Sequence, residues 1–183
     1  MAWSTPATYT AGQILTAAQM NLISANLNAG GPCFLRVRRA VAQSIAGNVA
    51  GAVRFDTEDV DTAGIFTVSA NTITIATAGL YMLSATVGFE TNGTGTRGVA
   101  IFSGATVSGA TDAATITAGT RITGNMVGPS SGVTQTVPSC STLFSVTAGQ
   151  VFAVMAYQNS GGALNIGNVA EQTTFSAAYV GAL

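Results

Sequence analysis

The chain has 183 residues, of which 48% are hydrophobic and only 7% are charged, and its net charge is −1. Soluble domains usually carry about 25% charged residues, so this surface must consist largely of Thr, Ser, Asn, Gln, Ala and Gly. Such a surface favours burial against copies of the chain or within a larger assembly. The six basic residues, all of them Arg, are too few for a nucleic-acid-binding face, so we expect no nucleic-acid partner.

The residue types that catalysis most often requires are missing. The sequence has no His and no Lys, which removes the usual general bases. Two isolated cysteines cannot form a zinc site, and no glycine-rich phosphate-binding motif lies between a strand and a helix. We therefore expect no catalytic residues, no cofactor and no enzyme activity.

The N-terminus, MAWSTPATYT, lacks the basic and apolar regions of a signal peptide. No apolar run approaches the roughly 20 residues that span a bilayer. We expect synthesis in a cytoplasm and no membrane partner.

Residues 1–32 have a different pattern from the rest of the chain and are predicted to form an arm and a helix. Pro6 and the Thr residues around it favour an extended arm. Thr16 and Gln19 have the spacing of a capping box, which satisfies main-chain N–H groups at a helix start. Residues 30–32, Gly-Gly-Pro, end the helix. One apolar stripe at helical spacing consists of Met20, Ile23 and Leu27.

This helix is predicted to span about four turns with one narrow apolar face, so it needs a surface to lie on. The apolar and aromatic side chains of the segment are candidates for docking to a partner, because aromatic residues contribute much of the energy of interfaces. The alternative is that they pack on the chain's own β-domain. The candidate docking residues are Trp3, Tyr9, Met20, Ile23 and Leu27.

Residues 33–183 are predicted to form one antiparallel β-sandwich domain. Roughly ten short β-rich or alternating segments, separated by Gly-containing turns, are typical of a sandwich or barrel. No helical pattern interrupts them, so a parallel sheet with crossover helices is not expected. A turn is predicted at Ala70-Asn71. The predicted strands lie within residues 34–43, 52–56, 65–79, 80–90, 97–104, 114–127, 136–146, 151–160, 163–168 and 173–182.

The densest polar cluster is the segment DTEDVD, whose four acids are Asp56, Glu58, Asp59 and Asp61. Crowded carboxylates need neutralisation, and oxygen ligands suit Ca²⁺. The segment lacks the Gly and the distal Glu of an EF-hand, so it is only a weak calcium candidate. We favour the alternative of a solvated loop paired with Arg54 or Arg97.

The only basic cluster is Arg36, Arg38 and Arg39. Alternation along a strand puts Arg36 and Arg38 on one face and Arg39 on the other. These arginines are candidates for charge contacts with acids across a subunit interface. The alternative is an exposed edge strand that the charges protect from pairing.

Cys33 and Cys140 are the only cysteines. A disulfide requires the fold to bring their Cα atoms within about 6 Å. We favour two buried free thiols, and the disulfide stays open as the alternative.

The β-domain resembles the C1q/TNF-like jelly-roll family. VRFD (53–56) and residues 64–89 resemble the family's early strands, with Gly79-Leu80-Tyr81 opening a long strand. Later segments resemble the next strands: RGVAIFSG (97–104), residues 139–157, with Gln150 in the place of the usual Asp, and TTFSAAYV (173–180), with Ala177 in the place of Gly. The resemblance implies a ten-stranded jelly-roll sandwich that forms a homotrimer about a threefold axis.

The N-terminal segment resembles the start of small virion proteins of tailed bacteriophages. The residues that carry this resemblance are AWSTPATYTAGQILTAAQMNLISANLNA: a Trp near the start, Tyr-x-x-Gly-Gln, then Thr-Ala-Ala-x-Met-Asn and Asn-Leu. The resemblance implies a structural component of a virus particle.

Three functions follow as hypotheses. The first is a trimeric capsid decoration protein on the virion surface, which braces the head and binds the major capsid protein or another virion protein through its N-terminal arm. It is favoured because no collagen repeat or heptad run projects the domain outward. The second is a tail-tip or fibre-head module that binds a host receptor through the loops TNGTGT (91–96) and GPSSG (128–132). The third is a free lectin-like or calcium-binding module.

Overall fold

The computed structural model describes residues 16–21, 34–62, 64, 66–67, 71–109, 111–130, 134–167 and 172–182. The chain divides into two compact units, Met1–Pro32 and Cys33–Leu183. In the first unit, residues 17–21 are helical. The predicted capping box is confirmed: the Thr16 N–H donates to Gln19 Oε1 at 2.8 Å, and the Gln19 N–H donates to Thr16 Oγ1 at 3.3 Å. The rest of the predicted arm and helix lies outside the described residues.

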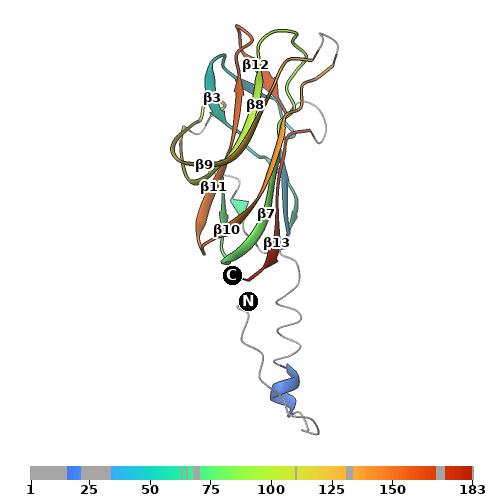
Figure 1. The fold of residues 1–183 in the computed structure, drawn as a ribbon, viewed down its shortest axis with the longest axis vertical. Coiled ribbons are helices and arrows are strands. Elements are labelled where there is room, and N and C mark those ends of the chain that lie inside the picture. The colour runs from blue at the N-terminus through green and yellow to red at the C-terminus, as the bar shows by residue number, and fades with distance from the viewer. Residues whose placement is uncertain are drawn as a thin grey trace. The chain divides into compact units, whose positions relative to one another are not determined.

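The second unit is an all-β antiparallel sandwich, as predicted (Figure 1). The five-stranded sheet has the order β10 (Ser139–Val146), β7 (Gly79–Thr86), β13 (Thr174–Gly181), β1 (Phe34–Arg38) and β4 (Thr57–Asp61). The six-stranded sheet has the order β3 (Val49–Ala52), β9 (Thr115–Val127), β8 (Arg97–Ser108), β11 (Gln150–Gln158), β6 (Thr72–Ile75) and β5 (Phe66–Thr67), and β3 also pairs with β11. A third, small sheet joins β12 (Leu164–Ile166) to β2 (Gln43–Ile45).

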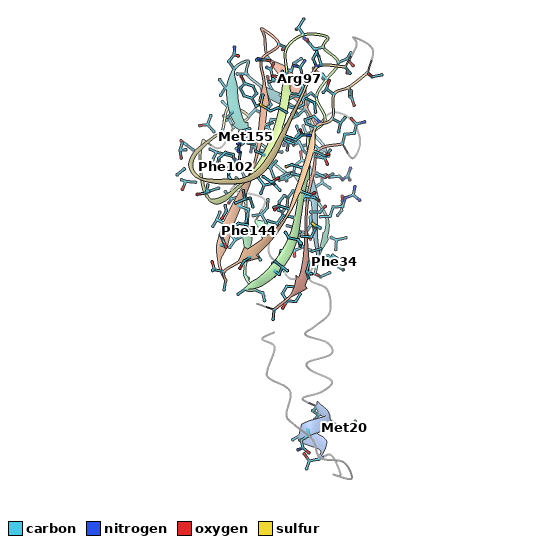
Figure 2. The ribbon with its side chains drawn as sticks, in the orientation of Figure 1. Met20, Phe34, Arg97, Phe102, Phe144 and Met155 are labelled. Atoms are coloured by element: carbon cyan, nitrogen blue, oxygen red, sulfur yellow. The ribbon has the colours of Figure 1, made fainter. Side chains whose placement is uncertain are left out.

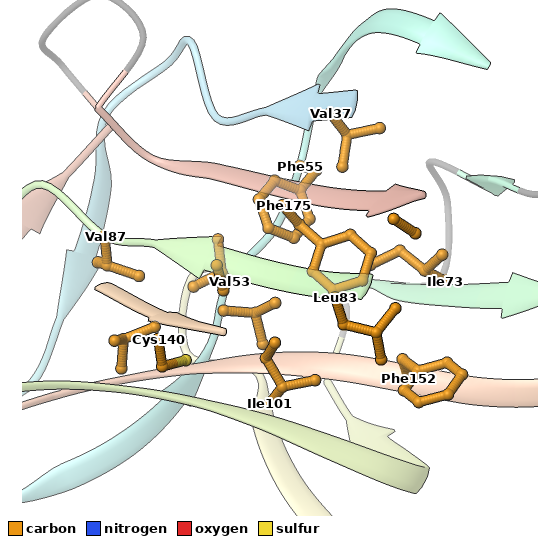
Figure 3. Packing of buried hydrophobic residues seen from close by; sticks show 14 of the residues in the cluster. Val37, Val53, Phe55, Ile73, Leu83, Val87, Ile101, Cys140, Phe152 and Phe175 are labelled. Carbon is orange, nitrogen blue, oxygen red and sulfur yellow. The ribbon is translucent and has the colours of Figure 1, made fainter. Parts of the chain in front are cut away.

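The core lies between the two large sheets and follows from the alternation of each strand. In β7, Tyr81, Leu83 and Ala85 point inward and are completely or almost completely buried. Phe175 of β13 and Phe152 of β11 fill the space between the sheets, and Figure 3 shows them on either side of Leu83. Complete burial of each such side chain stabilises the fold by about 1.5–3 kcal/mol.

Two predictions about the segment after β3 are wrong. Residues 53–56 (VRFD) do not form a strand but connect β3 to β4, although Val53 and Phe55 are buried as a strand's inward residues would be. Their main chain is bonded irregularly: the Val53 N–H donates to the Val154 carbonyl, and the Arg54 N–H donates to the Gln43 side chain. The acidic residues 57–61, predicted as a loop, form strand β4 along β1, with a register shift that accommodates one extra residue.

In the β8–β9 hairpin, β8 has 12 residues and continues past the predicted end at residue 104, whereas β9, with 13 residues, nearly matches the predicted 114–127. Gly104 was expected to end the first strand, but it bends the strand instead. Gly104 and Gly119 have positive φ angles of 62° and 129° and lie beside register shifts of the hairpin. The far end of the hairpin turns onto β3, where the Ala52 N–H donates to the Ala114 carbonyl at 2.8 Å. The predicted turn at Asn71 is confirmed, with φ of 54°.

Candidate interaction surface

The outer face of the five-stranded sheet carries a row of exposed apolar side chains across four strands. Strand register places Leu143 opposite Met82, Met82 opposite Ala178, and Ala178 opposite Phe34. Leu143 is 55% exposed, Met82 44% and Phe34 43%, and the neighbouring Val180 is 57% exposed. Figure 2 shows Phe34 on the opposite side of the sandwich from Phe102 and Met155. The apolar row is the name we use for Leu143, Met82, Ala178, Phe34 and Val180.

The same face becomes polar beside the apolar row. The next cross-strand row joins Ser141, Ser84, Ser176 and Arg36, and the one after it joins Ser139, Thr86, Thr174 and Arg38. Most of this half of the face therefore consists of short hydroxyl side chains that protrude little from a flat sheet. The apolar row is distinct from its surroundings in both size and chemistry, and such exposed patches mark interaction sites in soluble proteins.

The sequence contained a signal for this face that the prediction missed. A strand with one solvent-exposed face alternates apolar and polar residues. Residues 80–83, however, are Leu-Tyr-Met-Leu, and residues 143–144 are Leu-Phe. In each case one apolar residue enters the core and its neighbour faces outward. Apolar residues at both odd and even positions of a strand therefore indicate that its outer face is covered as well as its core face.

The three arginines of the basic cluster are divided between two faces, as predicted. Arg36 and Arg38 both face outward and reach the same carboxylate, with Nε to Asp59 distances of 3.5 Å and 2.9 Å. Arg39 is buried, with 8% exposure. The edge-strand interpretation is wrong, because β1 lies between β13 and β4. The proposed contacts of these arginines with another subunit stay a prediction.

Arg39 joins two carboxylates from distant segments: Nη1 lies 2.9 Å from Asp56 and Nη2 lies 3.6 Å from Asp112, at the tip of the β8–β9 hairpin. Asp112 also lies 3.4 Å from Arg54. Asp56 accepts hydrogen bonds from the N–H groups of Ala40 and Val41 at 2.7 and 3.1 Å. Burial raises the pKa of Asp56, but these bonds, a bond from Thr57 and the charge of Arg39 outweigh it, so the pKa is lower than usual. No sequence pattern indicated the role of Asp112.

The acidic residues of β4 do not converge as ligands of a metal ion would. Among the described residues no group of three or more His, Cys, Asp or Glu side chains is placed to hold one. Asp56 and Asp59 are paired with arginines, and the partners are Arg36, Arg38 and Arg39 rather than Arg54 or Arg97. Glu58 is exposed on the edge strand.

The predicted docking residues fall almost entirely outside the described part of the chain. Met20 lies on the helix of residues 17–21 and is 50% exposed. Trp3, Tyr9, Ile23 and Leu27 lie outside the described residues. No described helix is long and apolar enough to cross a membrane.

Cys140 is a buried free thiol on β10, as favoured from the sequence. Burial raises its pKa to about 11. Cys33 lies outside the described residues.

No protein-family model matches the sequence, and no curated protein does. The fold is similar to that of murine APRIL, with a TM-score of 0.58 and 11% identity over 80% of this chain and 98% of that one. It is also similar to Eiger TNF from S. frugiperda, with a TM-score of 0.56 and 8% identity over 83% of this chain and 93% of that one. The globular domain of zebrafish complement 1qA protein matches with a TM-score of 0.47 and 10% identity over 79% of this chain and 94% of that one.

The similarities to murine APRIL and Eiger TNF confirm the jelly-roll fold inferred from the β-domain segments. At such low identities they concern the fold alone. The resemblance of the N-terminal segment to phage virion proteins stays a prediction.

Proposed function

We propose that the chain is a homotrimeric structural protein of a tailed-bacteriophage particle, most suited to decorating the capsid. In this proposal the apolar row joins the three copies, and the N-terminal segment attaches the trimer to the head surface. The observation that supports it best is the apolar row itself, an exposed strip of aliphatic and aromatic side chains across the centre of one sheet.

The character of the row favours a copy of this chain as its occupant. It contains no charged side chain, so it repels no copy of itself, and the cores of homodimer interfaces are similarly apolar. A chain with 7% charged residues has few other means of staying soluble. The number of three copies comes from the resemblance of residues 53–180 to C1q/TNF-like domains.

The virion assignment is supported by the N-terminal resemblance and by the surface chemistry. A weakly charged surface suits close packing of many copies. A tail-tip receptor-binding module remains the competing function, and copy number separates the two.

The oligomer is tested with charges placed in the apolar row. In the variants Leu143→Asp and Met82→Asp, a carboxylate would have to be buried without a partner, so we expect the trimer to dissociate. Val41→Asp is the matched control, because Val41 is 62% exposed and lies in the loop after β1. Light scattering should give three times the 18.2 kDa chain mass for the wild type and for the control. A wild-type mass near that of one chain at micromolar concentration would contradict the trimer.

The location is tested on intact particles. Electron cryomicroscopy and quantitative mass spectrometry should find many copies over the head. A copy number of only a few tens or fewer, or density at the tail tip, would overturn the decoration role and favour receptor binding.

A further inference from the structure

Arg97, the first residue of β8, is an arginine buried with 0% exposure. Its hydrogen bonds go to main-chain carbonyl oxygens: Nη1 donates to Thr94 at 2.9 Å and to Thr96 at 3.1 Å, and Nη2 donates to Asn92 at 3.1 Å. The ring of Phe89 lies 5.9 Å from the guanidinium carbon. Burial lowers the pKa of Arg97. A buried cation is costly unless it is hydrogen-bonded. The carbonyl groups of the loop bind Nη1 and Nη2 of this guanidinium, while Nε has no hydrogen-bond partner among the described residues.

The loop of residues 91–96 is therefore shaped from inside the molecule. Three of its carbonyl groups point inward and accept hydrogen bonds from one guanidinium. Loss of Arg97 would remove the guanidinium donor from all three carbonyls. The Thr96 carbonyl would keep its bond from the Asn159 N–H, whereas the Asn92 and Thr94 carbonyls would need another partner. The loop conformation and the Arg97 side chain consequently depend on each other.

A second loop, residues 159–162, is fastened to the first. Asn159 Oδ1 accepts from the Thr96 N–H, and the Asn159 N–H donates to the Thr96 carbonyl at 3.3 Å. The Thr94 hydroxyl donates to the Ser160 carbonyl at 3.1 Å. The completely buried Gln158 holds this loop from below, since its Oε1 accepts from the Ser160 N–H at 2.8 Å and its Nε2 donates to the Gly162 carbonyl at 2.6 Å. The two loops form one surface that is organised before any ligand arrives.

One aromatic side chain stands beside this surface. Tyr157 is partly exposed, and strand register places Gly98 and Ala50 on either side of it. Neither neighbour has a side chain larger than a methyl group, and the Met126 side chain lies over Gly98 next to Tyr157: a Cβ at Gly98 would lie 3.3 Å from Met126 Cγ and 3.5 Å from Tyr157 Cβ. We call Tyr157 and the loops 91–96 and 159–162 the loop platform.

The chemistry of the loop platform selects among ligand classes. Its exposed side chains are hydroxyls and carboxamides, so it lacks the cations that a nucleic acid requires. Its loops contain none of the exposed large apolar residues that anchor protein interfaces. Rigid hydroxyl and amide groups next to an aromatic ring suit a ligand that has many hydroxyl groups and apolar C–H faces.

We propose that the loop platform is a carbohydrate-binding site. Tyr157 faces a sugar ring, the Asn159 side-chain NH₂ donates to its hydroxyl groups, and the Thr94 and Ser160 hydroxyl oxygens accept from them, since the protons of these two hydroxyls are donated within the loops. Because the loops are fixed in advance, binding costs little ordering entropy. This site is separate from the apolar row and does not depend on the proposed place in a virion.

The test uses the full-length protein and NMR titration with oligosaccharides of glucose, galactose, mannose, rhamnose and N-acetylglucosamine. At concentrations of about 10 mM, which detect millimolar Kd values, at least one sugar should shift amide signals of residues 91–98 and 157–162. Tyr157→Ala and Asn159→Ala should each weaken binding about tenfold. Thr117→Ala, an exposed hydroxyl on β9, is the control and should bind as the wild type does.

The preorganisation is tested in the same experiment. Arg97→Lys keeps the charge but loses the three-carbonyl geometry, and it should weaken sugar binding while hydrogen exchange becomes faster in both loops. If Arg97→Lys does not fold, Asn159→Ala provides the loop measurement. The proposal is overturned if no sugar of the panel shifts these signals, or if Tyr157→Ala and Asn159→Ala bind as tightly as Thr117→Ala.

Discussion

At the residue scale, Arg39 connects more segments than its place at the end of a short strand would indicate. It reaches Asp56 after β3, Asp112 in the β8–β9 hairpin and the Ala42 carbonyl in its own loop. Gly167 packs directly against its side chain, in a backbone conformation with φ of +81° where a Cβ would collide with Arg39. Three distant parts of the sequence, together with the loop that follows Arg39, are therefore packed around this one side chain.

Asp56→Asn should lower the free energy of unfolding by about 2 kcal/mol at pH 7, because hydrogen bonds to a charged group are lost. The pKa of Asp56 is lower in the folded than in the unfolded protein. The ionised carboxylate thus stabilises the fold above the unfolded value of about 3.9, and this contribution disappears as pH falls through the folded value.

Denaturant unfolding at several pH values measures this difference. The wild type and Asp56→Asn should converge in stability at acidic pH, whereas Glu58→Gln should match the wild type throughout, because Glu58 is exposed. A pH-independent gap between Asp56→Asn and the wild type would show that packing, not charge, is responsible.

Cys140 should resist alkylation. With a pKa of about 11 and a buried side chain, its thiolate fraction at pH 8 is roughly one in a thousand, against about a quarter for a free thiol. In a Cys33→Ser variant, iodoacetamide should modify Cys140 only after denaturation. Rapid modification of the folded protein would contradict the buried position.

At the scale of the element, the β8–β9 hairpin is held at both ends by different means. Near its open end, side chains bridge to the neighbouring sheet: the Asn125 amide donates to the Ser139 carbonyl at 3.1 Å, and the Thr123 hydroxyl donates to the Ser141 carbonyl at 3.4 Å. At its tip, Asp112 contacts Arg39 and Arg54.

Asp112→Ala should release the tip without unfolding the domain. Because the Asp112 side chain is 43% exposed, we expect a loss of only about 0.5–1 kcal/mol. Hydrogen exchange at residues 111–115 should become faster, while β7 and β11 stay protected. Thr111→Ala in the same turn is the control, and equal exchange in both variants would mean that the ion pairs do not hold the tip.

Sequence patterns predicted most of the elements but not their ends or partners. Alternation located β1, β7, β10, β11 and β13, because each has one face in the core. It failed for residues 53–56, whose buried Val53 and Phe55 alternate like a strand although their main-chain bonds go to scattered partners. It also failed for residues 57–61, because none of the residues of edge strand β4 is buried and its sequence therefore shows no alternation.

The candidate surfaces were less predictable than the strands. The apolar row depends on register between strands up to about 140 positions apart, which no local pattern encodes. The sequence indicates Arg97 only as a partner for acidic residues, because a single Arg after TNGTGT is no sign that the loop closes over it. Within the loop platform, TNGTGT was predicted as a contact loop from its glycine and asparagine content, and Tyr157 was not.

At the scale of the whole molecule, the two units are expected to have separate tasks. Deleting residues 1–32 should leave a folded β-domain that still forms a trimer, because the core and the apolar row both lie in residues 34–182. The truncated protein should no longer join the particle. Met20→Asp in the full chain is the gentler variant, since Met20 is half-exposed.

Copy number on purified particles measures this effect. Equal incorporation of the truncated and the complete protein would refute the attachment role of the N-terminal segment. Loss of the trimer in the truncated protein would instead show that the segment contributes to the subunit contact.

The central strand of the five-stranded sheet is β13 (Thr174–Gly181), which is synthesised after both of the strands that it pairs with, β1 and β7. Until β13 arrives, β1 and β7 each expose an edge that has no partner. Native pairings at such long range make folding slow and leave nascent chains prone to aggregation. The apolar row is also incomplete without Ala178 and Val180. Association of subunits is therefore expected to follow the synthesis of β13, and chains that terminate before β13 should not be incorporated into the assembly.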